Sequence, residues 1–174
     1  MRSHCNRSRA GAAGVAALAF AALMPVSAAA DPAVNPAAAA LDRHQQGVEA
    51  FNAHHVEAVA DIYAEDAILR DPQAPEPIQG REAIRETYEK LFRAFPDAQV
   101  TMLNVYAEGD LIMYELQFSG TNDGPIVTPE GDIPATGQRI EMPQVVVSEV
   151  DEDGRFRDTR RYYDTAEVTR QLAR

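Results

Sequence analysis

The 174-residue sequence has one cysteine, Cys5, and no tryptophan. Cys5 precedes an apolar run near the N-terminus, so a mature chain that begins after that run has no cysteine at all. Disulfide bonds and thiol chemistry are then excluded. The fold must rest on a hydrophobic core, which a chain of this length can form as a single domain.

Basic residues are scarce compared with acidic ones, at 16 against 27. Three of the arginines, Arg2, Arg7 and Arg9, stand before the apolar run, and without them 13 basic residues face 27 acidic ones, a net charge of −14. Such a charge repels nucleic acid and anionic lipid, so neither is expected as a partner. It is compatible with a ligand that carries little negative charge.

The first 30 residues have the layout of a secretory signal peptide. A basic start is followed by the apolar run 10–26 and by small residues that end at Ala30. The run is short for a membrane-spanning helix of ~20 residues, so cleavage after Ala30 is favoured over an uncleaved anchor. We therefore expect an exported protein, periplasmic or secreted, with no membrane attachment after cleavage. Residues 31–40 form a low-complexity lead-in, and residues 41–174 form the domain.

The first half of the mature chain has the periodicity of helices, which are expected over 36–52, over about 56–63, and between Gly80 and Pro96. The third is the clearest, because apolar residues recur at helical spacing on one side and charged residues fill the other. Tyr63 falls at the end of the second predicted helix, and Tyr88 falls on the apolar side of the third.

After Asp97 the apolar period changes to two, which is typical of strands. Asp164 can cap a short closing helix. Three helices followed by a meander of antiparallel strands indicate an α+β fold, in which a curved antiparallel sheet packs on the three helices as a cone around one apolar pocket. The strands are expected over 100–106, 111–121, 139–151 and 156–163, and the closing helix over 165–172.

The stretch from Tyr63 to Tyr88 carries the residues of greatest chemical interest. Asp71 follows a short apolar segment and stands against Pro72. A carboxylate at the mouth of a half-apolar pocket can act as a general base. No phosphate-binding or dinucleotide-binding motif accompanies it, so no cofactor is expected. His44, His54 and His55 lack a usual ligand spacing, so no metal is expected either.

Several motifs resemble the SnoaL-like and ketosteroid isomerase-like domains of the nuclear transport factor two-like superfamily. They are Tyr63-Ala-Glu-Asp-Ala-x-x-x-Asp71-Pro72, Gly80-Arg-Glu-Ala-Ile84, Asp151-Glu-Asp-Gly154 and Tyr162-Tyr163-Asp164. The resemblance spans most of residues 45–170. It implies a cone-shaped α+β fold and cofactor-free isomerase, cyclase or hydrolase chemistry on a small apolar carbonyl compound or epoxide, as in the steroid delta-isomerases.

In this resemblance Asp71 falls on the general base of ketosteroid isomerase, and Tyr63 and Tyr88 fall on tyrosines that support its oxyanion hole. The two direct donors of that hole do not carry over, because Gly47 and Val146 stand at their positions. The cyclase pattern departs as well. Its pocket histidine also falls at Val146, and its catalytic aspartate falls at Arg161.

An arginine close to Asp71 would keep the carboxylate ionised and able to orient a water molecule. Asp–Arg arrangements of this kind occur in the limonene epoxide hydrolase branch of the superfamily. The alternative is a structural ion pair. If Tyr163 points into the cone, Arg161 does too, and Tyr162 points away. The residues expected to line the substrate pocket are Tyr63, Tyr88, Tyr114, Gln144, Val146, Arg161 and Tyr163.

Three functions remain open at this point. The first is an enzyme that uses Asp71 as general base. The second is a non-catalytic protein that binds a small apolar molecule in the same pocket. The third is a dimerisation module, in which an open sheet face pairs with a second copy to form a homodimer. That face would carry Leu111, Met113, Val145 and Val147.

Overall fold

The structure is a computed structural model that describes residues 36–128 and 131–174. The predicted signal peptide and most of the lead-in lie outside the described residues, so cleavage and export stay predictions. Within the described ranges, the helices are all too short or too polar to span a bilayer.

Four helices are described, and three of them match the predicted positions closely. The second, however, ends at Ala60, and Tyr63 opens a strand instead of closing that helix. The reason is tertiary pairing, which overrides the helical spacing of the apolar residues. Tyr63 pairs with Phe156, and the Phe156 N–H donates to the Ile62 carbonyl at 2.9 Å. The helices are α1 (Pro36–Asn52), α2 (Val56–Ala60), α3 (Arg81–Ala94) and α4 (Thr165–Leu172).

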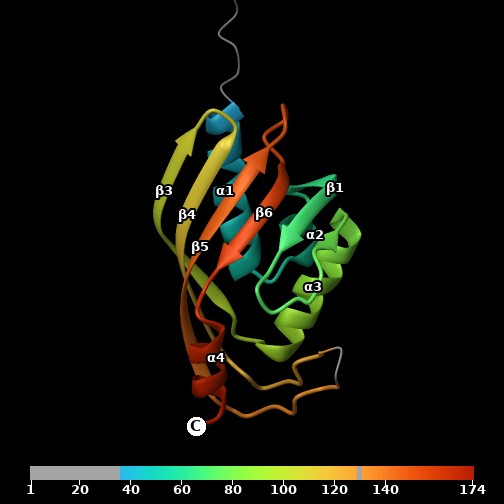
Figure 1. Cartoon of the computed structure of the whole chain (residues 1–174), viewed down its shortest axis with the longest axis vertical. Coiled ribbons are helices and arrows are strands. Elements are labelled where there is room, and N and C mark those ends of the chain that lie inside the picture. Colours follow the sequence, from blue (N-terminus) through green and yellow to red (C-terminus); the bar gives the residue numbers. More distant parts are fainter. Residues whose placement is uncertain (1–35, 129–130) are drawn as a thin grey trace, which may run out of the picture. The chain divides into compact units, whose positions relative to one another are not determined.

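Six strands form one curved sheet, and α1, α2 and α3 cover one of its faces (Figure 1). The four predicted strands are present, each within two residues of its expected ends. Two further strands, β1 and β2, were not predicted. Because β1 pairs with β6 in parallel, the sheet is mixed, and the prediction of an antiparallel sheet was wrong. The strands are β1 (Tyr63–Arg70), β2 (Ile78–Gln79), β3 (Gln99–Glu108), β4 (Leu111–Thr121), β5 (Arg139–Val150) and β6 (Phe156–Tyr162), in the order β2-β1-β6-β5-β4-β3.

The register of the sheet arranges its inner side chains in rows. Tyr114 on β4 lies opposite Val146 on β5, which lies opposite Arg161 on β6. Directly paired residues point to the same face of a sheet. The row made by Tyr114, Val146 and Arg161, called the central row below, therefore faces the helices.

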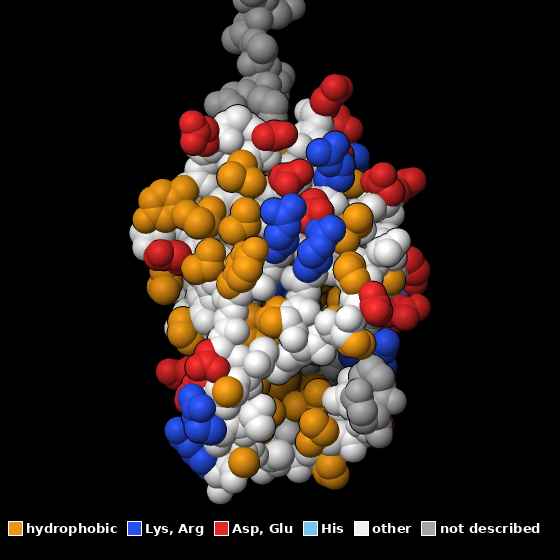
Figure 2. Space-filling view, in the orientation of Figure 1, with side chains coloured by type: hydrophobic (Ala, Val, Ile, Leu, Met, Phe, Trp, Pro, Cys, Tyr) orange, Lys and Arg blue, Asp and Glu red, His pale blue; other side chains and the backbone are white. Residues whose placement is uncertain are grey.

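The outer face of the sheet is apolar over β3, β4 and β5 (Figure 2). Leu111 and Met113 are exposed there, as their alternation with buried neighbours predicts. Leu103 and Tyr106 on β3 are exposed too. Pairing of this face with a second copy stays a prediction.

The loop 122–138 is fastened to the C-terminal end of α3 by one buried side chain, Asn122, which is 0% exposed. Its amide nitrogen donates to the carbonyls of Ala94 at 3.3 Å and of Gly124 at 2.7 Å. Its amide oxygen accepts from the Thr136 N–H at 3.0 Å. These bonds hold both ends of the loop against the helix.

Candidate functional site

Asp71 follows β1 directly, and the parallel pairing with β6 decides its neighbour. The register sets Arg70 beside Arg160, so the next residues, Asp71 and Arg161, come together at the strand ends. Nη1 of Arg161 donates to Oδ2 of Asp71 at 3.2 Å. Both side chains are mostly buried, at 14% exposure for Asp71 and 17% for Arg161. The structure therefore brings Asp71 and Arg161 into direct contact.

The other carboxylate oxygen of Asp71 accepts two hydrogen bonds. The Tyr163 hydroxyl donates to Oδ1 at 2.5 Å, and the Gln73 N–H donates to the same atom at 3.0 Å. Burial, and then the Asp71 carboxylate, raise the pKa of Tyr163, so this hydroxyl keeps its proton at neutral pH. A carboxylate offers about four lone-pair positions. With three of them used, Oδ2 of Asp71 retains one for a water molecule or a substrate.

Arg161 also connects Asp71 to a pair of tyrosines. Its Nη2 donates to the Tyr88 hydroxyl, and the hydroxyl oxygens of Tyr88 and Tyr63 lie 2.9 Å apart. Burial, and then the neighbouring Tyr88, raise the pKa of Tyr63 well above its usual range, so Tyr63 is protonated. The two hydroxyls share a single contact. One O–H hydrogen of this pair thus has no acceptor among the described residues.

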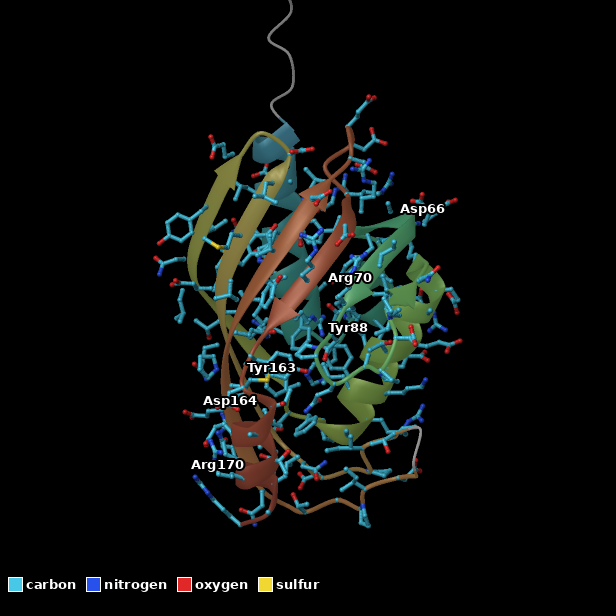
Figure 3. The ribbon with its side chains drawn as sticks, viewed as in Figure 1. Asp66, Arg70, Tyr88, Tyr163, Asp164 and Arg170 are labelled. Atoms are coloured by element: carbon cyan, nitrogen blue, oxygen red, sulfur yellow. The ribbon has the colours of Figure 1, made fainter. Side chains whose placement is uncertain are left out.

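The charge of Arg161 is also secured by its surroundings. Burial alone would lower the pKa of the guanidinium, but the phenolic oxygens of Tyr88 and Tyr63 and the Asp71 carboxylate raise it. Arg161 is therefore a permanent cation between the carboxylate and the tyrosines. Figure 3 shows Tyr88 on α3 and Tyr163 at the end of β6, two elements that are far apart in the sequence.

The remaining predicted pocket residues lie on the inner face of the sheet. Val146 sits between Tyr114 and Arg161 in the central row and is 8% exposed. Gln144 is half-buried, and within the described chain its carboxamide makes no hydrogen bond. Gly47 is buried on α1, where an added Cβ would lie 2.9 Å from Cδ1 of Ile62. α1 therefore packs closely on the side chain of Ile62 at this position, and Gly47 itself supplies no side-chain donor.

A second polar pair, His44 on α1 and Tyr114, lies deeper in the fold. The two rings stack with centroids 3.6 Å apart, and both are buried. Neither ring nitrogen of His44 nor the hydroxyl of Tyr114 has a hydrogen-bond partner in the described chain. An unpaired buried polar group costs about 1–3 kcal/mol. The sequence position of His44 suggested only a metal ligand, without the usual ligand spacing. Its spacing of three from Gly47, which puts both on one helix face, was the signal that could have placed it here.

Burial lowers the pKa of His44 from 6.5 to about 4. At a pH between these two values, His44 binds a proton in the unfolded chain but not in the folded chain. The free energy of unfolding is therefore expected to fall as the pH drops through this window, by about 3 kcal/mol from this group. Urea unfolding at several pH values measures this decrease in the free energy of unfolding. The variant His44→Phe keeps a ring at the stacking position and should remove the part of the decrease that His44 causes. The exposed His55, changed to Gln, serves as the control. A loss that His44→Phe leaves unchanged would contradict the assignment.

Two cavities in the part of the chain that the structure describes both lie away from Asp71, where an apolar pocket was expected. One, of about 380 Å³, is lined by residues of α1, by residues at and after α2, and by Arg155, and the other, of about 270 Å³, lies around Asp110 and Arg157. Figure 2 does show a hollow with apolar side chains between α4, the end of α3 and the loop 122–138. The half-buried apolar residues of these elements are Leu91, Phe92, Ile126 and Leu172.

No cluster of three or more His, Cys, Asp or Glu side chains that could hold a metal ion occurs in residues 36–128 and 131–174. The polar groups at Asp71 are arranged as one carboxylate, one guanidinium and three phenols. Such a set can move a proton and donate hydrogen bonds to a developing oxyanion.

Several solved structures share this fold. A proposed polyketide cyclase from Xanthomonas campestris pv. campestris is 25% identical, with 79% of this chain and 98% of that chain covered and a TM-score of 0.67. IdmH from Streptomyces antibioticus, also a proposed polyketide cyclase, is 25% identical, with 78% and 99% covered and a TM-score of 0.62. An epoxide hydrolase of the LEH-like kind from M. tuberculosis is 17% identical, with 79% and 91% covered and a TM-score of 0.60, and shows the fold alone.

No curated protein sequence matches this chain. The family model that describes the SnoaL-like polyketide cyclases matches residues 42–172, which is nearly all of the described structure. Its range begins two residues before His44 and ends at the last residue of α4. The resemblance read from the sequence motifs is thereby confirmed, and the chain belongs to the SnoaL-like polyketide cyclase family.

Proposed function

We propose that this protein catalyses cofactor-free acid–base chemistry on a small apolar molecule that contains a carbonyl group or an epoxide. The observation that carries the proposal is that an acceptor and a donor, both in contact with Arg161, have no hydrogen-bond partner in the described chain. One is the lone pair on Oδ2 of Asp71, and the other is the O–H hydrogen left over from the Tyr63–Tyr88 pair. Arg161 contacts both groups, since Nη1 donates to Asp71 and Nη2 donates to Tyr88.

For a ketone, Asp71 takes a proton from the carbon next to the carbonyl while the spare O–H donates to the oxygen that becomes an enolate. Return of the proton to another carbon completes an isomerisation. For an epoxide, Asp71 takes a proton from water or from a substrate hydroxyl, whose oxygen attacks the ring carbon. The C–O bond breaks, and its oxygen receives a proton from the tyrosine pair. Asp71 then releases its proton to solvent, and solvent returns a proton to the tyrosine pair. A single oxyanion donor contributes ~3–4 kcal/mol to such steps.

The kinds of relative found are compatible with both reactions. Relatives at 25% identity are proposed polyketide cyclases, and a protein that shares the fold is an epoxide hydrolase. The Asp71–Arg161 pair favours activation of an oxygen nucleophile, because the remaining lone pair on Oδ2 of Asp71 can accept from a water molecule or from a substrate hydroxyl.

A binding protein without catalysis is the second candidate function. Two observations favour it. Gly47 supplies no side-chain donor on α1, and Val146 supplies none on β5. Such a protein would hold its ligand against the same tyrosines without turning it over.

A labelling experiment distinguishes the two functions. The purified protein is incubated with a panel of ketones, enones and epoxides in deuterium oxide and, separately, in oxygen-18-labelled water. Deuterium next to the carbonyl reports enolisation, and oxygen-18 in a diol reports hydrolysis, while an isomerised or cyclised product reports the remaining reactions. Heat-denatured protein is the control. If no panel member is labelled or converted while apolar molecules still bind, the enzyme proposal is wrong and the binding protein is supported.

A further inference from the structure

A cavity of about 380 Å³ lies at the start of β6, away from the groups proposed for acid–base chemistry. One of its lining residues, Arg155, comes directly before β6, and Arg161, which holds Asp71, stands six residues later. Along an extended strand this separation is roughly 20 Å. The cavity has the volume of a pocket for a small molecule, and the proposed function does not use it. Its lining residues are Arg43, Gln46, Ala58, Asp61, Ile62 and Arg155.

Two arginines from distant parts of the chain meet at this cavity. Arg43, on α1, donates from Nη2 to the carbonyl of Asp153 at 3.0 Å, and Nη1 of Arg155 lies 3.6 Å from the carboxylate of Asp153. In Figure 1 the turn between β5 and β6, which contains Asp153, lies at the same end of the molecule as the first half of α1. This turn therefore brings the two cations together.

Most hydrogen-bond donors of these two side chains have no partner in the described chain. A guanidinium has five N–H groups. The bond from Arg43 to Asp153 is the one side-chain hydrogen bond that either arginine makes within residues 36–128 and 131–174. Nε of Arg43 and Nε of Arg155 are both buried and unpaired there. Because folded proteins usually satisfy such donors, two under-used arginines at one cavity indicate that the cavity binds an anionic group.

A carboxylate lies at the same cavity and does not neutralise these cations. Asp61 follows α2, and its one ion pair in the described ranges is a long contact of 4.0 Å with Arg81. In the same ranges it makes no ion pair with Arg43 or Arg155. Opposite charges that face one cavity without contacting each other can bind the two ends of a dipolar molecule.

We propose that this cavity binds a small zwitterion of the amino acid kind, with its carboxylate on Arg43 and Arg155 and its ammonium group on Asp61. Arginine binds a carboxylate through two parallel N–H bonds. The exposed Ala58 and the buried Ile62 supply an apolar wall for a short aliphatic side chain. A phosphate dianion fits less well, because the carboxylates close to the arginines repel a second negative charge. The site goes beyond the proposed function and shares no residue with it.

Three ligands that differ in one charged group test this site by isothermal titration calorimetry on the full chain. Leucine carries both charged groups, 4-methylpentanoate lacks the ammonium group, and 3-methylbutylamine lacks the carboxylate. We expect leucine to bind about tenfold more tightly than either analogue, as one added hydrogen bond between charged groups allows.

Two variants separate the two ends of the ligand. Asp61 is 75% exposed, so Asp61→Asn should fold normally. It should reduce the affinity for leucine to that for 4-methylpentanoate without weakening 4-methylpentanoate. Arg43→Gln should weaken leucine and 4-methylpentanoate by about tenfold and leave the binding of 3-methylbutylamine unchanged. Arg157→Gln, on β6 and outside this cavity, is the matched control.

Three results would overturn the inference. They are leucine that does not bind, leucine that binds no more tightly than an analogue, and leucine binding that Asp61→Asn leaves unchanged. Asp71→Asn should not affect leucine binding, because the two sites are separate. A loss of binding in that variant would place leucine at Asp71 and would contradict the inference as well. Labelling of the substrate panel judges the acid–base function separately, because it does not depend on these ligands.

Discussion

Asp71→Asn is expected to lower kcat/KM for any substrate found in the panel by roughly 10²–10⁴-fold, the usual contribution of a general base. The amide keeps the size of the side chain and can still accept from the Tyr163 hydroxyl, but it cannot take up a proton. Steady-state kinetics measures the loss. Binding of a substrate analogue should change far less than turnover, because the contact removed acts on the transferred proton.

The substitution also leaves Arg161 without its counter-charge, so a loss of activity by misfolding must be separated from a loss of the base. Circular dichroism and a melting curve do so directly. The double variant with Arg161→Met removes the unpaired cation and should fold at least as well as Asp71→Asn while staying inactive. Asp66→Asn, an exposed residue on β1, is the matched control (Figure 3). Full activity in a folded Asp71→Asn protein would exclude Asp71 as the base.

Gly124→Ala is expected to destabilise the domain severely, by about 3 kcal/mol or more. An added Cβ would lie 2.0 Å from the Arg93 carbonyl oxygen, a backbone atom that cannot swing aside. The Gly124 N–H also donates to the Ala94 carbonyl at 3.1 Å, so the loop cannot move outward without losing that bond. Relief requires the loop to leave the end of α3, and with it the hydrogen bonds of Asn122.

Urea unfolding measures this effect as a shift of the midpoint. Asp123→Ala changes an exposed neighbour in the same loop and should shift the midpoint little. If Gly124→Ala unfolds at the same urea concentration as the unaltered protein, the close approach of the loop to α3 is wrong.

Strands with one buried and one exposed face could be predicted from the sequence, because their buried side chains recur with a period of two. β4 alternates buried and exposed residues and was placed correctly. β1 begins with two buried residues and then two exposed ones, a pattern that does not distinguish a strand from the end of a helix. Its strand conformation comes from pairing with β6, which is a property of the whole chain.

The residues of the site also differ in whether the sequence could predict their contacts. Asp71 and Arg161 could be brought together by the family motif and by the alternation that also turns Tyr163 inward. The stacking of His44 on Tyr114 could not be predicted, because no local sequence pattern indicates which helix residue contacts which strand residue. The reason for Gly47 was also hidden, since its partner Ile62 lies in the short connection after α2.

The parallel pairing of β1 with β6 also bears on the order in which the protein folds. Asp71 and Arg161 are 90 residues apart, and Tyr163 is 92 residues from its partner. Contacts of such long range form slowly, since a large loop must close before any of them is made. During synthesis Asp71 therefore remains without its cation and its phenol until β6 and Tyr163 have left the ribosome. The carboxylate becomes a shielded, oriented group only when β6 docks beside β1, so the strand that carries the base cannot form the site by itself.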